Sequence, residues 1–128
     1  MKRVTLYAIL LLVIGAATVG RAQKKNDPCG ESQTQADLNI CWGNQYKAAD
    51  TRLNQAYRQF MTKLDDEEKV QLKGAQTAWV KYRDTNCDFV GDQFKGGSMR
   101  PMIAAICLTD LTDSRTNELK AQMKERDQ

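Results

Sequence analysis

The stretch QADLNICWGNQYKAADTRLNQAYRQFMTKL, residues 35–64, decides the fold class of this chain. Its apolar residues recur at intervals of three and four, which is the period of one face of an α-helix. They are Leu38, Cys41, Trp42, Tyr46, Ala49, Leu53, Tyr57, Phe60 and Leu64. Thr34 precedes the stretch as a candidate N-cap, with Asp37 three positions on. The sequence therefore predicts a helix from about Gln35 to Leu64.

Two further helical segments follow the first. The second begins with an acidic turn, residues 66–68, whose carboxylates can accept from unpaired backbone N–H groups. Its predicted stripe consists of Leu72, Ala75, Trp79, Tyr82 and Val90, with Phe94 at its end. Gly96 and Gly97 then break the pattern. A third helix is predicted to start near Ser98, as its cap, or Pro101, and its apolar residues are Met102, Ile103, Ile106, Leu111, Leu119 and Met123.

The short connections between these segments favour antiparallel neighbours. We therefore predict an all-α fold, an up-down-up bundle of three long helices over residues 34–128, preceded by a polar lead at residues 23–33. A helix rises about 1.5 Å per residue, and counting from the turns brings Cys41, Cys87 and Cys107 to one end of the bundle. Cys29, in the lead, can reach the same end.

The first 22 residues have the features of a cleavable export signal. Lys2 and Arg3 give a basic start, and an apolar run from Val4 to Ala17 ends in small residues. The run is shorter than the roughly 20 residues that a membrane-spanning helix needs. We expect cleavage after Ala22 and a periplasmic or secreted protein without stable membrane insertion.

The charge of the chain depends on that cleavage. The full chain carries 19 basic and 16 acidic residues, a net charge of +3. Lys2, Arg3 and Arg21 leave with the signal, so 16 basic residues remain against 16 acidic ones. A neutral mature protein gives no support for a nucleic-acid partner.

The four cysteines, Cys29, Cys41, Cys87 and Cys107, all follow the signal. An even number in a small exported protein predicts disulfides, here two. The chain has no histidine and no Cys-x-x-Cys pair, which disfavours the alternative of a zinc site. Axial counting leaves all three pairings open, with a slight preference for Cys29 with Cys87 and Cys41 with Cys107.

Three charged residues lie on or beside the apolar stripes at similar heights, namely Asp50, Arg83 and Arg115. We predict an ion pair across helices between Asp50 and either arginine. A ligand-binding or catalytic role is the alternative, but a partly buried structural bridge is favoured. Removing Asp50 is then expected to destabilise the fold strongly, because a buried partner charge is left unpaired.

Features for catalysis are scarce. The absence of histidine removes the commonest general base, and bridged cysteines leave no thiol nucleophile. Ser98 follows two glycines but lacks the strand and motif of a nucleophile elbow. We predict a binding protein and not an enzyme, with no cofactor and no metal.

Two segments are candidate partner surfaces. The first is a basic, glycine-centred loop whose candidate contact residues are Lys95, Gly96, Gly97, Ser98 and Arg100. The second is the acidic turn at residues 65–68. A plain helix connection and a capped helix start explain them more simply, so neither is specific alone.

A wider set of residues resembles a known family. The set is Thr34-Gln35, Leu38-Asn39, Cys41, Tyr46, Ala49-Asp50, Leu53-Asn54, Tyr57, Leu72-Lys73, Ala75-Gln76, Ala78-Trp79, Tyr82-Arg83-Asp84, Cys87, Gly96-Gly97-Ser98, Cys107-Leu108, Leu111-Thr112, Arg115-Thr116 and Glu118-Leu119. It resembles the LprI-type lysozyme-inhibitor-like family of exported bacterial proteins, named for a mycobacterial lipoprotein. This chain lacks the lipoprotein cysteine, which favours an unanchored protein.

The resemblance implies a lysozyme inhibitor that occludes the lysozyme cleft. A periplasmic interaction or envelope-stress module without lysozyme activity is the alternative. A small-molecule binder around Asp50 is a third hypothesis, and an open pocket at that residue would distinguish it.

Overall fold

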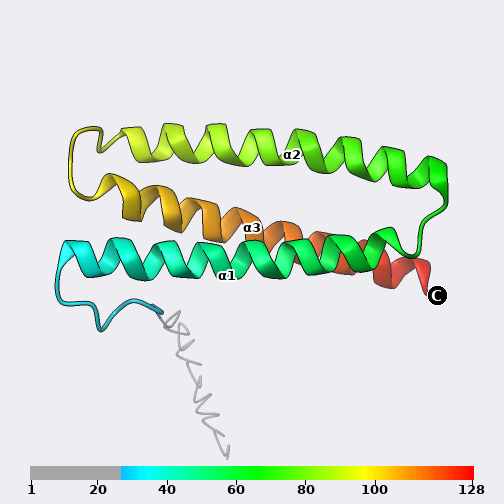
Figure 1. Cartoon of the computed structure of the whole chain (residues 1–128), viewed down its shortest axis with the longest axis horizontal. Helices are drawn as coiled ribbons and strands as arrows, with labels where there is room; N and C mark the ends of the chain where they lie inside the picture. The colour runs from blue at the N-terminus through cyan, green and yellow to red at the C-terminus, as the bar shows by residue number, and fades with distance from the viewer. Residues whose placement is uncertain (1–26) are drawn as a thin grey trace, which may run out of the picture.

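The computed structural model describes residues 27–128, and over that range it contains three α-helices and no strand. They are α1 (Gln35–Met61), α2 (Asp66–Asp92) and α3 (Arg100–Arg126). Consecutive helices run in opposite directions (Figure 1), which confirms the predicted up-down-up arrangement. The predicted export signal lies outside the described residues. Within them, no helix is both long and apolar enough to cross a membrane.

Side-chain caps fix the starts of the first two helices. The Thr34 hydroxyl accepts from the Asp37 backbone N–H, and the Asp37 carboxylate accepts from the Thr34 backbone N–H. Asp65 and Glu68 form the same reciprocal capping box at the start of α2. Each box satisfies backbone donors that have no partner within the helix.

The start of α3 and the end of α1 differ from the prediction. The N-cap of α3 is Met99, without a side-chain cap hydrogen bond, so the predicted cap at Ser98 is wrong. The Ser98 carbonyl instead accepts from Asn39 Nδ2 at 3.1 Å. α1 ends at Met61, and Leu64 lies in the following turn, where its side chain still packs into the core. Burial of Leu64 therefore does not require the helix to continue to it.

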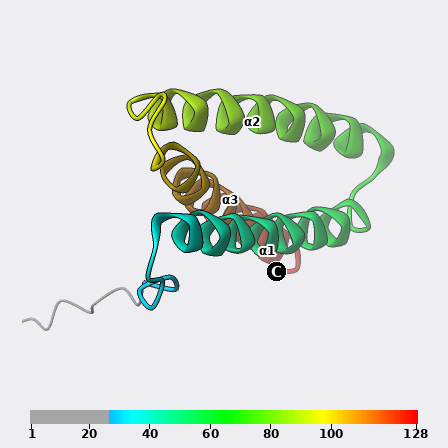
Figure 2. The ribbon, with the colours of Figure 1, turned by 60° about the vertical axis from the view of Figure 1, so that its left-hand side comes forward.

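The core lies mainly between α1 and α3, which pack side by side (Figures 1 and 2). Its centre consists of Leu53, Phe60, Leu64 and Leu119, against which Tyr57, Met61, Leu72, Trp79 and Met123 pack. Of the predicted stripe on α3, Leu119 is fully buried, whereas three threonines fill most of the remaining buried face. Two of them, Thr109 and Thr116, donate to backbone carbonyls one turn earlier, so their hydroxyls remain satisfied.

α2 packs chiefly on α3 and buries only Arg83, Cys87 and Gly91. A Cβ atom at Gly91 would come within 3.1 Å of the Ala104 Cβ, so glycine permits the close approach of α2 to α3. The predicted stripe on α2 is wrong at Ala75, Tyr82 and Phe94, which are exposed. The reason is that α1 does not cover α2, and a single neighbouring helix buries a narrow face.

Candidate functional site

The guanidinium group of Arg83 is the centre of the polar cluster in this bundle. Arg83 projects from the middle of α2, and only 6% of its surface is exposed. Its Cζ lies 5.4 Å from the ring centroid of Tyr46 on α1 and 5.2 Å from that of Trp79 on α2. Both distances are within the range of cation–π attraction. The two rings thus shield the charge from solvent while attracting it.

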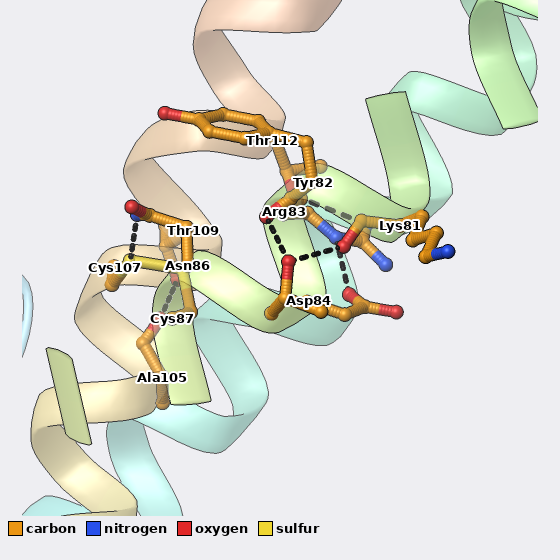
Figure 3. Close-up of a disulfide and its surroundings, with 11 residues drawn as sticks. Lys81, Tyr82, Arg83, Asp84, Asn86, Cys87, Ala105, Cys107, Thr109 and Thr112 are labelled. Atoms are coloured by element: carbon orange, nitrogen blue, oxygen red, sulfur yellow. Dashed lines mark hydrogen bonds and ion pairs between the residues drawn. A yellow bond between two sulfur atoms is a disulfide. The ribbon is translucent and has the colours of Figure 1, made fainter. Parts of the chain in front are cut away.

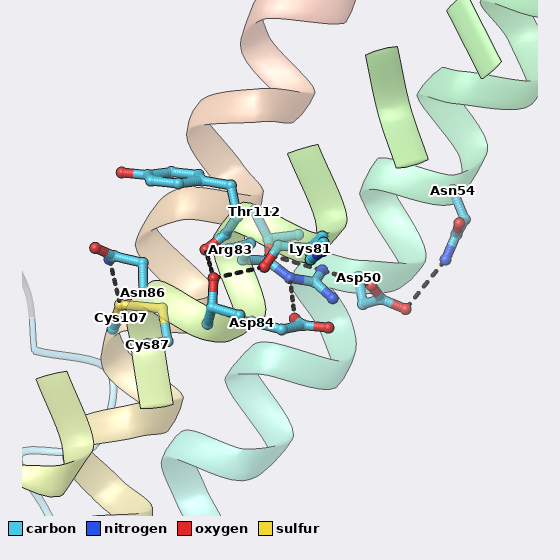
Figure 4. Close-up of polar contacts among 11 residues, drawn as sticks. Asp50, Asn54, Lys81, Arg83, Asp84, Asn86, Cys87, Cys107 and Thr112 are labelled. Atoms are coloured by element: carbon cyan, nitrogen blue, oxygen red, sulfur yellow. Dashed lines mark hydrogen bonds and ion pairs between the residues drawn. A yellow bond between two sulfur atoms is a disulfide. The ribbon is translucent and has the colours of Figure 1, made fainter. Parts of the chain in front are cut away.

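Hydrogen bonds from Arg83 reach all three helices. Nε donates to Asp84 at 2.9 Å, and Nη1 donates to Asp50 on α1 at 3.2 Å. Nη1 also lies 3.4 Å from the hydroxyl of Thr112 on α3 (Figure 4). The expected ion pair between Asp50 and Arg83 is therefore present, and it lies within a larger cluster that ties the three helices together.

The surroundings of Arg83 and Tyr46 determine the charge state of these two groups. Burial by itself lowers the pKa of Arg83, but the hydrogen bond to Asp84 and the charges around the guanidinium outweigh it and raise that pKa above its ordinary value. Burial raises the pKa of the Tyr46 phenol, and the nearby Arg83 only partly opposes this shift. Neither group titrates near neutral pH, so the cluster suits a structural role better than proton transfer.

Arg115 does not reach Asp50. Its Nε donates to Gln76 on α2 at 3.1 Å, and its Nη1 lies 3.0 Å from Glu118. Its Cζ is 5.9 Å from the ring centroid of Trp79. The predicted three-residue cluster is therefore divided, with the two arginines contacting the same tryptophan.

The two disulfides join Cys29 to Cys41 and Cys87 to Cys107, and no described cysteine is free. Two bridges were predicted, but the preferred pairing is wrong. The lead folds back onto the start of α1, so Cys29 pairs with a cysteine 12 positions away. Cys87 faces α3 and joins α2 to it (Figure 3). Axial counting gives the height of a cysteine along the bundle but not the direction in which it points.

The connection between α2 and α3, residues 93–99, forms what we call the tip. Lys95, Gly96, Gly97 and Ser98 are all exposed in it. Gly96 has φ +80°, a left-handed conformation that favours glycine. Arg100, one of the candidate contact residues, pairs with Asp92 at 2.8 Å and with Asp88 at 3.4 Å. The hydrogen bond to Asp92 is the main cause of its raised pKa.

A hollow of about 410 Å³ lies between the lead, α1 and α3. Its lining residues are Asp27, Pro28, Trp42, Gln45, Ile106, Thr109, Asp110 and Asp113. None belongs to the arginine cluster, so the hollow gives no support for a small-molecule site around Asp50. Over residues 27–128, no group of three acidic or cysteine side chains is arranged to hold a metal ion.

Comparison with known proteins shows the family to which the chain is related. The family model described as "Lysozyme inhibitor LprI" matches residues 26–119. The chain belongs to the LprI family. It is also similar to an uncharacterized protein of Rhizobium meliloti (strain 1021), with 37% identity over 90% of this chain and 92% of the relative. No solved structure matches it.

The LprI relationship and the cluster involve the same residues. Tyr46, Asp50, Trp79, Arg83 and Asp84 carry part of the family resemblance, and they surround or include the central guanidinium. Through Arg83, these residues join α2 to α1 and, with Thr112, to α3.

Sequence reasoning missed two partners of Arg83. Asp84 is the next residue along the helix, and adjacent side chains on a helix normally diverge. Thr112 gave no signal, because a threonine within a helix commonly bonds to its own backbone. Tyr46 and Trp79 were predicted as core residues, but their spacing alone does not reveal that they enclose a cation.

Proposed function

We propose that this LprI-family protein is an exported, periplasmic or secreted lysozyme inhibitor that binds lysozyme through its tip. The observation that carries the proposal is the match of the lysozyme-inhibitor family model to residues 26–119. Two disulfides suit an oxidising compartment outside the cytoplasm. The cluster around Arg83 supports the proposal indirectly, because it gives the helices a fixed arrangement from which the tip projects.

Contacts on both sides of the tip suit it for binding as a rigid element. Arg100 pairs with Asp88 and Asp92, which braces the start of α3 against the end of α2. Asn39 Nδ2 donates to the Ser98 carbonyl and so joins the tip to α1. A binding element that is already ordered loses less conformational entropy when it meets its partner.

Lys95 is the charge that suits contact with lysozyme. The catalytic groups of lysozyme are two carboxyl groups beside the sugar-binding site. Arg100 is already neutralised by two aspartates, whereas Lys95 is exposed at the tip. We therefore assign the electrostatic contact to Lys95 and the close approach of the backbone to Gly96 and Gly97.

Inhibition of lysis by the oxidised protein, residues 23–128, tests this proposal. Peptidoglycan lysis by lysozyme should slow when the protein is added, and the two proteins should bind at micromolar concentration. Lys95→Glu should weaken inhibition about tenfold or more, which corresponds to at least about 1.4 kcal/mol. Lys124→Glu is the matched control, because Lys124 is also exposed but lies in the last turn of α3, away from the tip.

The two parts of the proposal can fail separately. If the protein neither slows lysis nor binds lysozyme, lysozyme is not its target. If it inhibits and both lysine variants inhibit as well as the parent, a surface other than the tip makes the contact.

A further inference from the structure

α2 carries a row of small and aromatic side chains that no part of the described chain covers. Ala75, Ala78, Tyr82, Thr85 and Phe89 are spaced by three, four, three and four residues, and all are exposed. The two aromatic members expose 55% (Tyr82) and 72% (Phe89) of their surface. This spacing is that of the a and d positions through which two helices pack in a coiled coil. We call these five residues the α2 seam.

The seam is distinct from the face by which α2 joins its own bundle. That face is formed by Arg83, Cys87 and Gly91. Figure 3 shows Tyr82 pointing away from the side on which Arg83 lies, although the two residues are consecutive. Packing, the disulfide and the ion pairs of the bundle therefore leave the seam available. Its aromatic surface would lose contact with water if a second helix covered it.

We propose that the α2 seam docks, antiparallel, onto the α2 seam of a second copy of this chain. The sizes of the side chains are self-complementary in this arrangement. With the two-fold axis beside Arg83 and Asp84, Phe89 of each copy meets Ala78 of the other, and Tyr82 meets Thr85. Each large side chain then faces a small one. A parallel arrangement would place Phe89 against Phe89 and leave the alanines facing each other.

The charges beside the seam are also self-complementary. Lys81 and Asp88 occupy equivalent flanking positions one heptad apart, and both are exposed. Flanking charges set the partner and orientation of paired helices. In the antiparallel arrangement, Lys81 of each copy lies beside Asp88 of the other, which gives two symmetric ion pairs. Asp88 is available for this contact, since its side chain is 72% exposed and its pairing with Arg100 is long, at 3.4 Å.

This dimer is independent of the proposed lysozyme contact. A two-fold axis perpendicular to α2 places the two tips at opposite ends of the dimer, away from the seam. Such an interface is isologous, because the same patch is used by both copies. One seam is small compared with a standard interface, so we expect a reversible dimer.

Sedimentation equilibrium of the oxidised protein, residues 23–128, tests the proposal over the micromolar to millimolar range. We expect a monomer–dimer equilibrium in the parent protein and a monomer for Phe89→Lys. Val70→Lys is the matched control, because Val70 is also 72% exposed on α2 but lies outside the seam. This variant should dimerise like the parent. Circular dichroism should show the same helix content in all three proteins.

Charge exchange tests the orientation. Lys81→Asp and Asp88→Lys should each weaken the dimer about tenfold, because each places like charges together, and the double variant should restore it. A parent protein that stays monomeric would overturn the proposal, as would equal loss of dimer in Val70→Lys or failure of the double variant to recover. Lysozyme inhibition by Phe89→Lys should equal that of the parent, so failure of the dimer leaves the lysozyme proposal intact.

Discussion

At the scale of single residues, the Arg83 side chain is far more buried than the two carboxylates that pair with it. The Arg83 side chain is 7% exposed, while the side chains of its two carboxylate partners, Asp50 and Asp84, are 42% and 53% exposed. Most of the desolvation therefore falls on the guanidinium, which the two aromatic rings surround. Either carboxylate can be solvated by water if the arginine is removed. The arginine, in contrast, needs a partner wherever it is buried.

This inequality predicts different effects for the two sides of the ion pair. Arg83→Ala should lower the free energy of unfolding by about 2–4 kcal/mol, because it removes packing between two rings as well as three polar contacts. Asp50→Ala should cost only about 1 kcal/mol, since Arg83 keeps Asp84 and Thr112. Urea denaturation measures both values. Equal losses of unfolding free energy in the two variants would show that the stability of the cluster depends on Asp50, as the sequence alone suggested.

At the scale of elements, α2 is the helix least embedded in the fold. Its main attachments to the rest of the bundle include a narrow packed face on α3, the Cys87–Cys107 bridge and the contacts of Arg83. α1 and α3 share a larger core and do not depend on α2 for most of it. Local opening should therefore begin with α2, because few buried contacts must be broken to release it.

The disulfide between α2 and α3 should contribute most to the protection of the α2 amides from hydrogen exchange. The double variant Cys87→Ala/Cys107→Ala removes a disulfide that joins residues 20 positions apart. The free energy of unfolding should fall by about 3 kcal/mol, because the unfolded chain is no longer restricted by this loop. Hydrogen exchange should then accelerate through the second half of α2. In Cys29→Ala/Cys41→Ala, the acceleration should be confined to the lead and the start of α1. The same exchange pattern in both variants would contradict the separate attachment of α2.

Another attachment, the ion pair between Glu68 and Arg126, lies at the start of α2, and its contribution depends on pH. The hydrogen bond from Arg126 is the main cause of the lowered pKa of Glu68. A carboxyl with a lower pKa in the folded state adds stability above its unfolded pKa of about 4.3. It loses this contribution as the pH falls through the lowered value.

Comparison of Arg126→Gln with the parent over the acid range measures that contribution. The parent should be more stable above about pH 5, and the difference should shrink as Glu68 is protonated. Lys124→Gln, on the same last turn of α3, should show no such convergence. A difference that stays constant with pH would mean that Arg126 acts through its contact with Phe60 alone.

At the scale of the whole molecule, the tip lies at the end of the bundle that holds both disulfides. The two bridges and the ion pairs of Arg100 lie at this end, whereas the opposite end is held by non-covalent contacts, among them the ion pairs of Lys63 with Asp127 and of Glu68 with Arg126. The fold therefore concentrates its covalent reinforcement where the proposed contact with lysozyme is made.

The charge of the whole molecule predicts how ionic strength affects binding. If the signal is removed, basic and acidic residues balance at 16 each, so long-range steering toward a charged partner is weak. The association rate with lysozyme should change less than about threefold between low and physiological salt. Stopped-flow mixing measures this rate. A steep fall with salt would indicate that a strongly charged patch, and not the exposed Lys95 alone, guides the encounter.

The sequence by itself determined the helices, their order and their common cysteine-rich end. Apolar spacing, the cap at Thr34, the acidic turn at residues 66–68 and the break at Gly96 depend on a few neighbouring residues, so they can be recognised without the rest of the fold. Two disulfides followed from the number of cysteines and the predicted compartment. Axial counting between turns predicted an ion pair from Asp50 to Arg83 or Arg115, and the structure has the first of these.

Only the tertiary structure decided how each helix is rotated about its own axis. That rotation pairs Cys87 with Cys107, turns Arg115 toward Gln76 and leaves Tyr82 in solvent. Helical spacing allows more than one row of α2 to face inward, and the close contact of Gly91 with Ala104 helps to select the row that does. Height along a helix is a local property of the chain, whereas the direction of a side chain depends on every surface packed against it.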